Sequence, residues 1–455
     1  MFIMKISCLK TNIVNILFIG IIAITQTATG QTKDTVLTLE TCIKLCFTNN
    51  FKLKQVQYET EKSRYQYKEA LSNGFPQING ITSIDNYFNI PVTMVSGDIF
   101  GQPGTMLPVQ LGTKYNFNVG IQAGQMIYSA VYFASLELFR KSCQIADLNL
   151  EKGKEELAYN VTRLYIILQI SNLRLALIDS NLIALQKVYE YSKQHYTNGL
   201  ITKIDLDRAL VAISNLEAEN ENLISERNQQ LNMLKYLIGI EQCQPVTLTE
   251  KTEIKSIQKV LADSSLNHNS DILIYEQKKE LAILNLKLSR AEHLPSLTGY
   301  AVFSYNAQRE QFDMFDNNDY WNKTSFIGIK LNIPIFESGH IRSRVNQNKI
   351  ELEQTIAAQK DLKNETYLNY INALQKLNSS KMIASKLNEN TILAEKIFNA
   401  TNNQYQQGLK SLTDVLNAQS EYNSSRLNSL QALLQIRLSE LEIVKINGEI
   451  RSLYF

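Results

Sequence analysis

YTNGLITKID occupies residues 196–205 of this chain, and a second version, YQQGLKSLTD, occupies residues 405–414. Both share the spacing Tyr-x-x-Gly-x-x-Thr/Ser-x-x-Asp, and the second follows the first at an offset of 209 residues. Self-similarity at a fixed offset is the sign of a repeated structural unit. The chain is therefore expected to contain two related halves.

Each stretch is predicted to be the tip of a hairpin of two antiparallel helices. Gly199 suits the left-handed position that ends a helix. Thr202 suits the N-cap of the next helix, and Asp205, three residues later, completes a capping box and meets the positive end of the helix dipole. The same roles fall to Gly408, Ser411 and Asp414 in the second stretch, and the tyrosines that open the two stretches are Tyr196 and Tyr405.

The helices on either side of these tips are predicted to be very long. Apolar side chains recur at steps of three, four and seven residues from Leu157 to Val188, which is typical of a coiled coil. No proline interrupts residues 128–244 or 335–455. An unbroken helix of about sixty residues would be roughly 90 Å long, far longer than the average globular helix. Similar patterns run through residues 204–237, 341–397 and 412–444.

The duplication extends well beyond the tips. Asn50 corresponds to Asn269, and Gly239 corresponds to Gly448. The first half has about eleven additional residues, in a segment rich in proline and glycine between residues 78 and 120. Such a segment is predicted to be a loop, where insertions are tolerated best. We therefore divide the chain into a first repeat at residues 31–244 and a second at residues 245–455, after an N-terminal segment at residues 1–30.

Alternating side chains flank the predicted loops. Tyr115, Phe117 and Val119 face one way, whereas Asn116 and Asn118 face the other. This period of two is the signature of a strand with one apolar face. The sequence predicts four such strands, near residues 77–89, 113–125, 296–306 and 325–334.

Four short strands among long helices would make a poor soluble sheet, because two edges would stay open. Transmembrane barrels instead use strands of about 9–11 residues that turn apolar side chains to lipid and polar ones inward. Small barrels begin at about eight strands, so one chain cannot close a barrel. Two or three chains, with eight or twelve strands, are therefore expected to share one barrel in outer-membrane lipid.

The composition argues against other classes of protein. The 46 Lys+Arg nearly balance the 44 Asp+Glu, so the basic excess typical of proteins that bind nucleic acid is missing. No nucleophile–base pair, metal-ligand spacing or phosphate-binding loop indicates an enzyme, and no cofactor is predicted. Cys42 and Cys46 share a helical face but lack zinc-like spacing, so buried or unpaired thiols are expected.

Residues 1–30 are predicted to be a cleaved signal peptide. Two lysines precede an apolar run at residues 13–24, and Ala28 and Gly30 are small residues suited to cleavage before Gln31. A retained membrane anchor is the alternative, but the run is shorter than the ~20 residues that span a membrane. After Gln31 we expect no spanning helix.

Taken together, these motifs resemble those of the TolC-like outer-membrane factor family. The resemblance covers nearly all of residues 31–455 and rests on the duplicated halves, the proline entries into the first strand of each half, IPIF at residues 333–336 and DVLNAQ at residues 414–419. It implies a homotrimer in the outer membrane, with a barrel of twelve strands and a periplasmic tunnel of twelve helices. The tunnel would dock on a periplasmic adaptor and an inner-membrane transporter, as the passive exit duct of a tripartite efflux or type I secretion system.

The resemblance also implies roles for individual residues of the tips. Lys410 and Tyr405 of the second tip would bind Asp205 of the first and latch a closed entrance. Asp414 would contribute to an acidic ring around the opening. Asn417 occupies a ring position that is usually acidic in the family, so the ring would carry less charge.

Two questions stay open in the sequence. An exported structural coiled coil or adhesin stalk would also explain the signal and the helices, although it would not explain duplicated strands. The cargo, whether small molecules, metal ions or polypeptides, cannot be read from the chain, because the transporter would select it.

Overall fold

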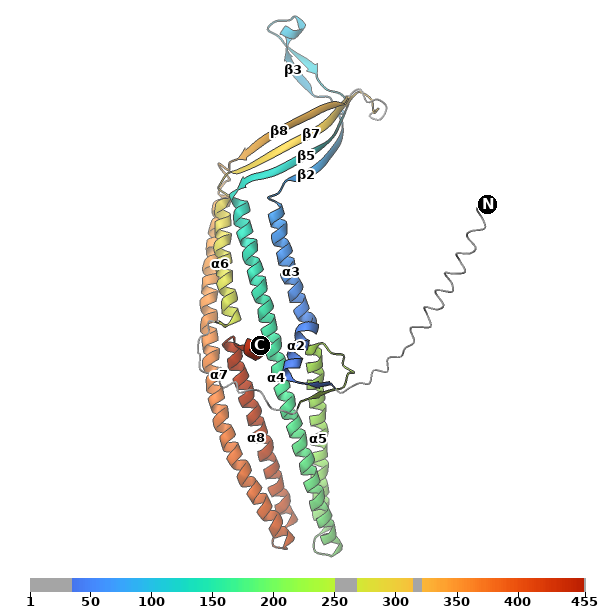
Figure 1. The fold of residues 1–455 in the computed structure, drawn as a ribbon, viewed down its shortest axis with the longest axis vertical. Helices are drawn as coiled ribbons and strands as arrows, with labels where there is room; N and C mark the ends of the chain where they lie inside the picture. Colours follow the sequence, from blue (N-terminus) through green and yellow to red (C-terminus); the bar gives the residue numbers. More distant parts are fainter. Residues whose placement is uncertain (1–34, 250–267, 314–320, 454–455) are drawn as a thin grey trace, which may run out of the picture.

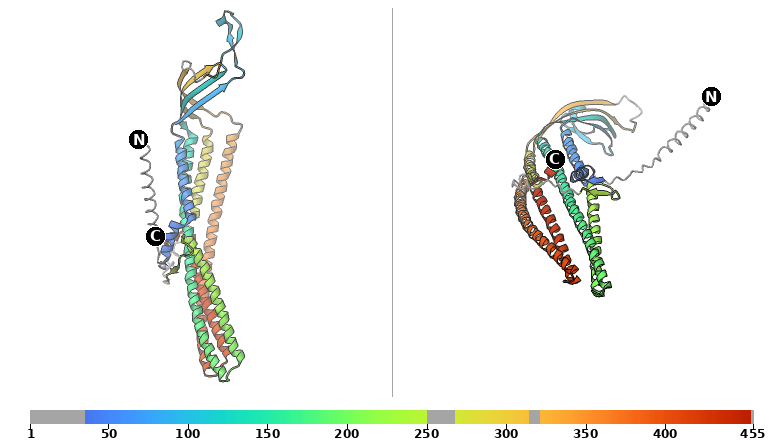
Figure 2. Two further views of the ribbon diagram at one scale, coloured as in Figure 1. Left: turned by 90° about the vertical axis from the view of Figure 1, so that its right-hand side faces the viewer. Right: turned by 60° about the horizontal axis from the view of Figure 1, so that its bottom comes forward.

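The computed structural model describes residues 35–249, 268–313 and 321–453, and the predicted signal peptide lies outside them. Figure 1 shows an elongated molecule in which a small sheet sits at one end of a layer of long helices. The side view in Figure 2 shows that the sheet and the helices follow one another along the long axis. The predicted mixed architecture of long helical hairpins and a separate sheet is confirmed.

Two helical hairpins form the end of the molecule opposite the sheet. The first consists of α4 (Ala130–Thr197, 68 residues) and α5 (Lys203–Ile238, 36 residues). The second consists of α7 (His340–Gln406, 67 residues) and α8 (Leu412–Ile446, 35 residues). At 1.5 Å per residue, α4 and α7 are each about 100 Å long. The prediction of helices too long for a globular domain is confirmed.

Two shorter helices, α3 (Phe51–Ser72) and α6 (Ser270–Ala291), continue the lines of α5 and α8 toward the sheet (Figure 1). The Asn50 side chain caps α3 and also donates from Nδ2 to the carbonyl of Leu237 at the end of α5, over 2.9 Å. Asn269 does the same for α6 and the carbonyl of Ile446, also over 2.9 Å. The two asparagines that match in the sequence therefore make equivalent bonds: Asn50 links the start of α3 to the end of α5, and Asn269 links the start of α6 to the end of α8.

The glycines that match in the sequence lie at these joints. Gly239 and Gly448 adopt left-handed backbone, with φ of +69° and +75°. A Cβ on Gly239 would lie 3.0 Å from the carbonyl carbon of Asn49, and one on Gly448 would lie 2.1 Å from the carbonyl oxygen of His268. Glycine is needed twice over, for the backbone conformation and for the close approach.

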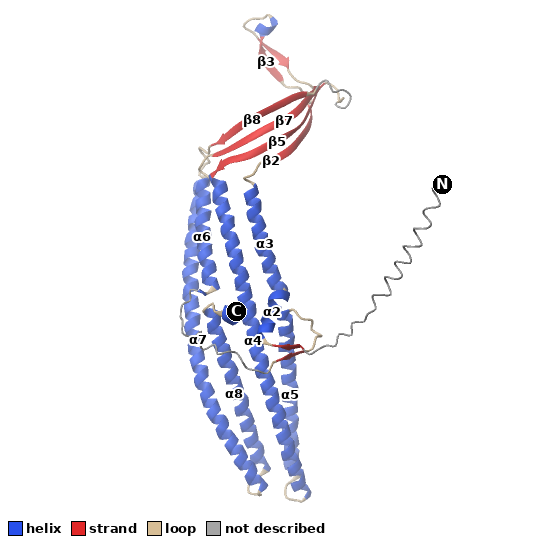
Figure 3. Cartoon of the chain, in the orientation of Figure 1, coloured by secondary structure: helices blue, strands red, loops and turns tan. Residues whose placement is uncertain are grey.

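Four antiparallel strands form the sheet, in the order β2-β5-β7-β8 (Figure 3). All four predicted strands are present, and β5 and β7 are longer than expected because they pair with each other over almost their whole length. Their bounds are Gln77–Asn86 for β2, Tyr115–Ser129 for β5, Ser296–Arg309 for β7 and Asn322–Asn332 for β8.

The two faces of this sheet differ in polarity. Cross-strand pairing places Ile78, Ile121, Phe303 and Ile327 on one face. These side chains are exposed, and Ile327 reaches 85%. The opposite face carries mainly Asn, Gln, Ser and Thr side chains, among them Asn79, Gln122, Asn118, Ser304 and Thr324.

The loop predicted between residues 78 and 120 is wrong in part. It contains a second hairpin, β3 (Val92–Ser96) with β4 (Met106–Gln110), joined by a short 3-10 helix, η1 (Gly97–Phe100). Its prolines and glycines obscured the alternation of short strands, since Pro108 sits inside β4. The connection between β7 and β8 begins after Arg309, and residues 314–320 lie outside the described ranges.

The main core lies midway along the helices, where the first and last described segments of the chain meet. A parallel pair, β1 (Thr35–Leu37) with β6 (Val246–Leu248), and helix α2 (Leu39–Asn49) pack there on α4 and α5. The 3-10 helix η5 (Ile450–Leu453) joins them from the C-terminal side. β1, β6 and η5 were not predicted from the sequence. The buried cluster includes Leu37, Cys42, Ile238, Leu441 and Ile450.

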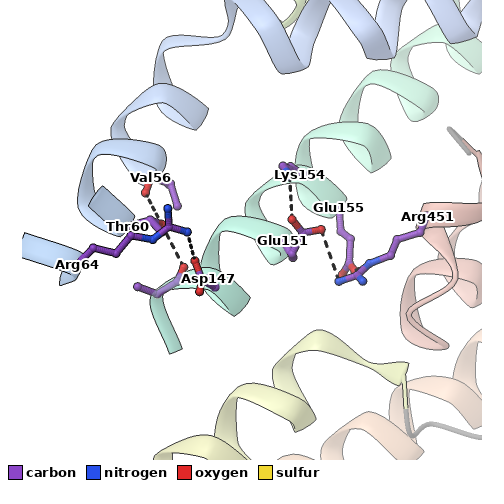
Figure 4. A network of polar contacts seen from close by, with 9 residues as sticks. Val56, Thr60, Arg64, Asp147, Glu151, Lys154, Glu155 and Arg451 are labelled. Atoms are coloured by element: carbon purple, nitrogen blue, oxygen red, sulfur yellow. Dashed lines mark hydrogen bonds and ion pairs between the residues drawn. The ribbon is translucent and has the colours of Figure 1, made fainter. Parts of the chain in front are cut away.

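Ion pairs on α4 fasten its neighbours to it (Figure 4). Arg64 of α3 donates to Asp147 over 3.0 Å. Arg451 of η5 donates from Nε to the buried Glu155 over 2.8 Å, and Ser270 at the start of α6 donates to the same carboxylate over 2.6 Å. α4 therefore lies at the centre of the fold and binds α3, α6 and η5.

One part of α4 is apolar and long enough to cross a membrane by length and composition, contrary to the expectation from the sequence. Of that part, 56% is buried within the fold. A buried core helix passes the same test, and α4 has that place in this molecule.

Candidate functional site at the helical tips

Both predicted capping boxes are present at the tips. At the first, Thr202 Oγ1 accepts from the Asp205 N–H over 3.3 Å, and Asp205 Oδ2 accepts from the Thr202 hydroxyl over 2.7 Å. At the second, Ser411 Oγ accepts from the Asp414 N–H over 3.2 Å, and Asp414 Oδ2 accepts from the Ser411 hydroxyl over 2.8 Å. The preceding glycines, Gly199 and Gly408, have φ of +75° and +76°.

These bonds hold both carboxylates in the charged form. The pKa of Asp414 lies below its ordinary value, first because of the hydrogen bonds from the Ser411 side chain and backbone and then because of the nearby Lys410 charge. The pKa of Asp205 is likewise lowered, chiefly by the Thr202 side-chain hydrogen bond, with smaller help from the Thr202 backbone and Arg208. Both residues carry a negative charge at neutral pH.

The second oxygens of the two carboxylates differ. Asp205 Oδ1 faces Arg208 Nη1 at 3.5 Å, so a positive charge accompanies this tip. No hydrogen bond or ion pair within the described ranges uses Asp414 Oδ1. Asp414 and, one helical turn further, Asn417 are exposed. The second tip therefore presents a carboxylate oxygen that the fold does not use.

The residues predicted to form a latch do not meet within one chain. Tyr405 is only 6% exposed, and its hydroxyl lies 3.2 Å from Ser192 Oγ on α4. Ser192 donates its own proton to the Val188 carbonyl over 2.7 Å. Lys410 is exposed and forms no ion pair with Asp205 in the described part of the chain. The latch stays a prediction.

Arg208 is the basic residue that connects the two tips in the structure. Its Nη1 donates to Thr413 Oγ1 of the second tip over 3.0 Å while it also faces Asp205. This role of Arg208 was not predicted from the sequence. The available signal was its position three residues after Asp205 on a helix, where side chains share a face.

An apolar cluster holds the tips together behind these polar groups. It contains Val188 of α4, Ala209 of α5, and Tyr405, Leu412 and Val415 of the second hairpin. The cluster fixes the relative position of the two capping boxes, because it draws on both hairpins.

Elsewhere in the described ranges, no group of three or more His, Cys, Asp or Glu side chains could hold a metal ion. Cys42 and Cys46 are free and buried in the main core. Burial raises the pKa of each thiol to about 12, so neither is a thiolate at neutral pH.

Comparison with known proteins identifies the family. The model of the outer membrane efflux protein family matches residues 43–240 and 261–449, which is most of the chain. The chain belongs to the outer membrane efflux protein family. The resemblance inferred from the duplicated tips and strands is thereby confirmed.

Individual members of the outer membrane efflux protein family are distant relatives. The outer membrane protein TolC of Vibrio cholerae is 20% identical over 354 residues, which cover 73% of this chain and 80% of that protein. The cation efflux system protein CusC of Escherichia coli is 22% identical over 327 residues, 70% of this chain and 66% of that protein. Neither carries the name of an enzyme.

Solved structures of outer membrane efflux proteins share the fold. A crystal structure of CusC superposes with a TM-score of 0.77 at 19% identity, covering 93% of this chain and 95% of that one. VceC of Vibrio cholerae superposes with a TM-score of 0.71 at 16% identity, covering 90% and 96%. The architecture is thus retained where the sequence is largely changed.

Proposed function

We propose that the chain is one subunit of a trimeric outer-membrane channel, whose helices form a tunnel through the periplasm. It is the passive exit duct of a tripartite efflux or type I secretion system, with a periplasmic adaptor and an inner-membrane transporter as partners. The transporter selects the cargo. The observation that carries the proposal is the sheet with an exposed apolar face, a polar face and two free edge strands.

The polarity of the two faces favours a membrane barrel. Ile78, Ile327 and Ile329 are each at least 70% exposed on one face. A soluble sheet would cover such a face, whereas a barrel turns it to lipid and turns its polar face to a water-filled interior. The strands, of 10 to 15 residues, are long enough to span a bilayer when tilted.

The strand order supports closure by copies of the same chain. β2 and β8 are the edges, and the three neighbouring pairs between them are all antiparallel. An even number of alternating strands makes β2 and β8 run in opposite directions. β8 of one copy can therefore pair with β2 of the next in the same antiparallel manner, and three copies supply twelve strands.

An exported coiled-coil or adhesin stalk is the competing function. It would account for α4 and α7 but leave the apolar face of the sheet without a purpose. Fractionation separates the two, since a barrel stays in the outer membrane after a high-salt wash and a stalk is released.

Native mass measurement of the detergent-solubilised protein tests the assembly. We expect a mass of three chains, each 51.9 kDa before loss of any signal peptide. Circular dichroism of the same sample should show both helix and strand. A stable monomer with its full strand content would overturn the shared barrel.

A further inference from the structure

A small cavity lies between the two helical hairpins, away from the capping boxes. Its volume is about 250 Å³, and α4, α5 and α8 line it. Leu185, Leu216 and Leu416 form apolar walls. Ligand pockets for drug-sized molecules are usually about 300–1,000 Å³, so this cavity suits a molecule of about one ring.

Three side-chain amides on its wall have polar atoms without a partner in the protein. They are Asn181 Nδ2 of α4 and, on α8, Gln419 Oε1 and Asn423 Oδ1. Asn181 and Gln419 are only 5% and 3% exposed. Buried polar groups are nearly always hydrogen-bonded, so this concentration of unmet groups on one cavity points to an occupant.

The amides define the chemistry of that occupant. They offer one donor and two acceptors, and a primary carboxamide has the complementary set: its NH₂ donates twice and its carbonyl accepts. Because the orientation of each side-chain amide is an assignment, the two ends of Asn181, Gln419 or Asn423 can be exchanged. A ligand amide still matches, since it also carries both kinds of group.

The charge around the cavity favours a neutral molecule. Asn and Gln side chains at the buried end have no formal charge, and the one lining carboxylate, Glu219, belongs to an exposed residue. We infer that this cavity binds a small neutral molecule carrying a primary carboxamide beside an apolar body. The site lies within a single chain, so it does not depend on closure of the barrel.

Benzamide is a suitable probe, and acetophenone, which has the same shape but no NH₂ donors, is its comparator. Saturation-transfer NMR on the detergent-solubilised assembly, with empty micelles as the blank, gives both affinities. Benzamide should bind at least about tenfold more tightly than acetophenone, the factor that corresponds to about 1.4 kcal/mol for unmet buried partners. Equal affinities, or no saturable binding, would show that the amides hold water only and would overturn the site.

Matched variants locate the binding. Gln419→Leu should weaken benzamide binding about tenfold. Gln169→Leu is the control, because Gln169 is also buried with an unpartnered Nε2 but does not line this cavity. A loss in both variants, or in neither, would contradict the assignment. Native mass measured on each sample reports the trimer separately, so failure of the channel proposal is distinguishable from failure of this one.

Discussion

At the scale of single residues, the duplicated tips have diverged in how they use one carboxylate. Asp205 and Asp414 cap their helices alike, yet Asp205 also faces Arg208, whereas one oxygen of Asp414 is unused by the described fold. Three Asp414 carboxylates around a three-fold axis would make a ring that attracts cations. The neutral Asn417 beside it would add ligands without charge.

Asp414→Asn tests the ring at neutral pH. Because the folded-state pKa is lowered, the cap bonds stabilise the fold above the unfolded pKa of about 3.9 and lose their effect as pH falls through the folded value, so they are intact at pH 7. We expect weaker cation selectivity and weaker block by a trivalent cation in planar bilayers. Asp207→Asn, which removes an exposed carboxylate of α5 outside both capping boxes, is the control. Unchanged reversal potentials in Asp414→Asn would show that Asp414 only caps its helix.

The latch is tested by changes that spare the apolar cluster at the tips. Tyr405→Phe removes the hydroxyl but keeps the buried ring, and Lys410→Gln removes the charge. Together they should raise single-channel conductance, because they remove two of the contacts that would hold the entrance closed. The ion pair of the exposed Lys410 would contribute only about 0.2–1 kcal/mol. Lys203→Gln, at the exposed start of α5, is the control. Equal conductance in all three proteins would refute the latch.

Much of this site could be read from the sequence, because capping is local. The spacing from Gly199 to Asp205 contains the whole turn, and the structure shows it twice. Contacts between hairpins could not be read. The partner of Tyr405 is Ser192, on another helix and distant in sequence, and no pattern along the chain specifies that pairing.

At the scale of elements, the hydrogen bonds of Asn50 and Asn269 join pairs of shorter helices end to end. α5 with α3, and α8 with α6, run beside an unbroken α4 or α7 (Figure 1). Matching of Asn50 with Asn269 was visible in the sequence, but their bonds to Leu237 and Ile446 were not, since these cross between elements. The β3–β4 hairpin was not predicted for a different reason. Its strands are only five residues long, and the glycines and prolines around them favoured the prediction of a loop.

Asn50→Ala should open the joint between α3 and α5. The variant loses an N-cap and leaves the buried Leu237 carbonyl without its donor, so local stability should fall by about 2–3 kcal/mol. Hydrogen exchange of the amides at residues 51–54 and 236–240 should speed up accordingly. Asn73→Ala, at the exposed far end of α3, is the control. Equal exchange in the two variants would show that the joint depends on packing instead.

At the scale of the whole molecule, a single chain leaves one apolar face of its sheet exposed. The face alternation was predictable from period-two patterns, but the register that aligns Ile121 with Phe303 was not, because it pairs the two halves of the chain. In the proposed barrel, the edge strands β2 and β8 would pair with neighbouring copies, which would leave no open edge.

Ile327→Arg tests which face meets lipid. A charged side chain on the lipid face costs about 2–4 kcal/mol near the bilayer centre. We expect less assembled protein in outer-membrane fractions. Thr324→Arg, on the opposite face of the same strand, should assemble normally and change only ion selectivity. If the two variants assembled equally well, the face assignment would be wrong.

The main core has a consequence for the order of events during synthesis. Leu37 and Ile450, from opposite ends of the described chain, are buried in the same cluster. Contacts between such distant residues slow folding, because a very large loop must close before they form. The core is therefore incomplete until the segment that contains Ile450 has been made, so the segments made earlier cannot reach their final packing while the chain is still being synthesised.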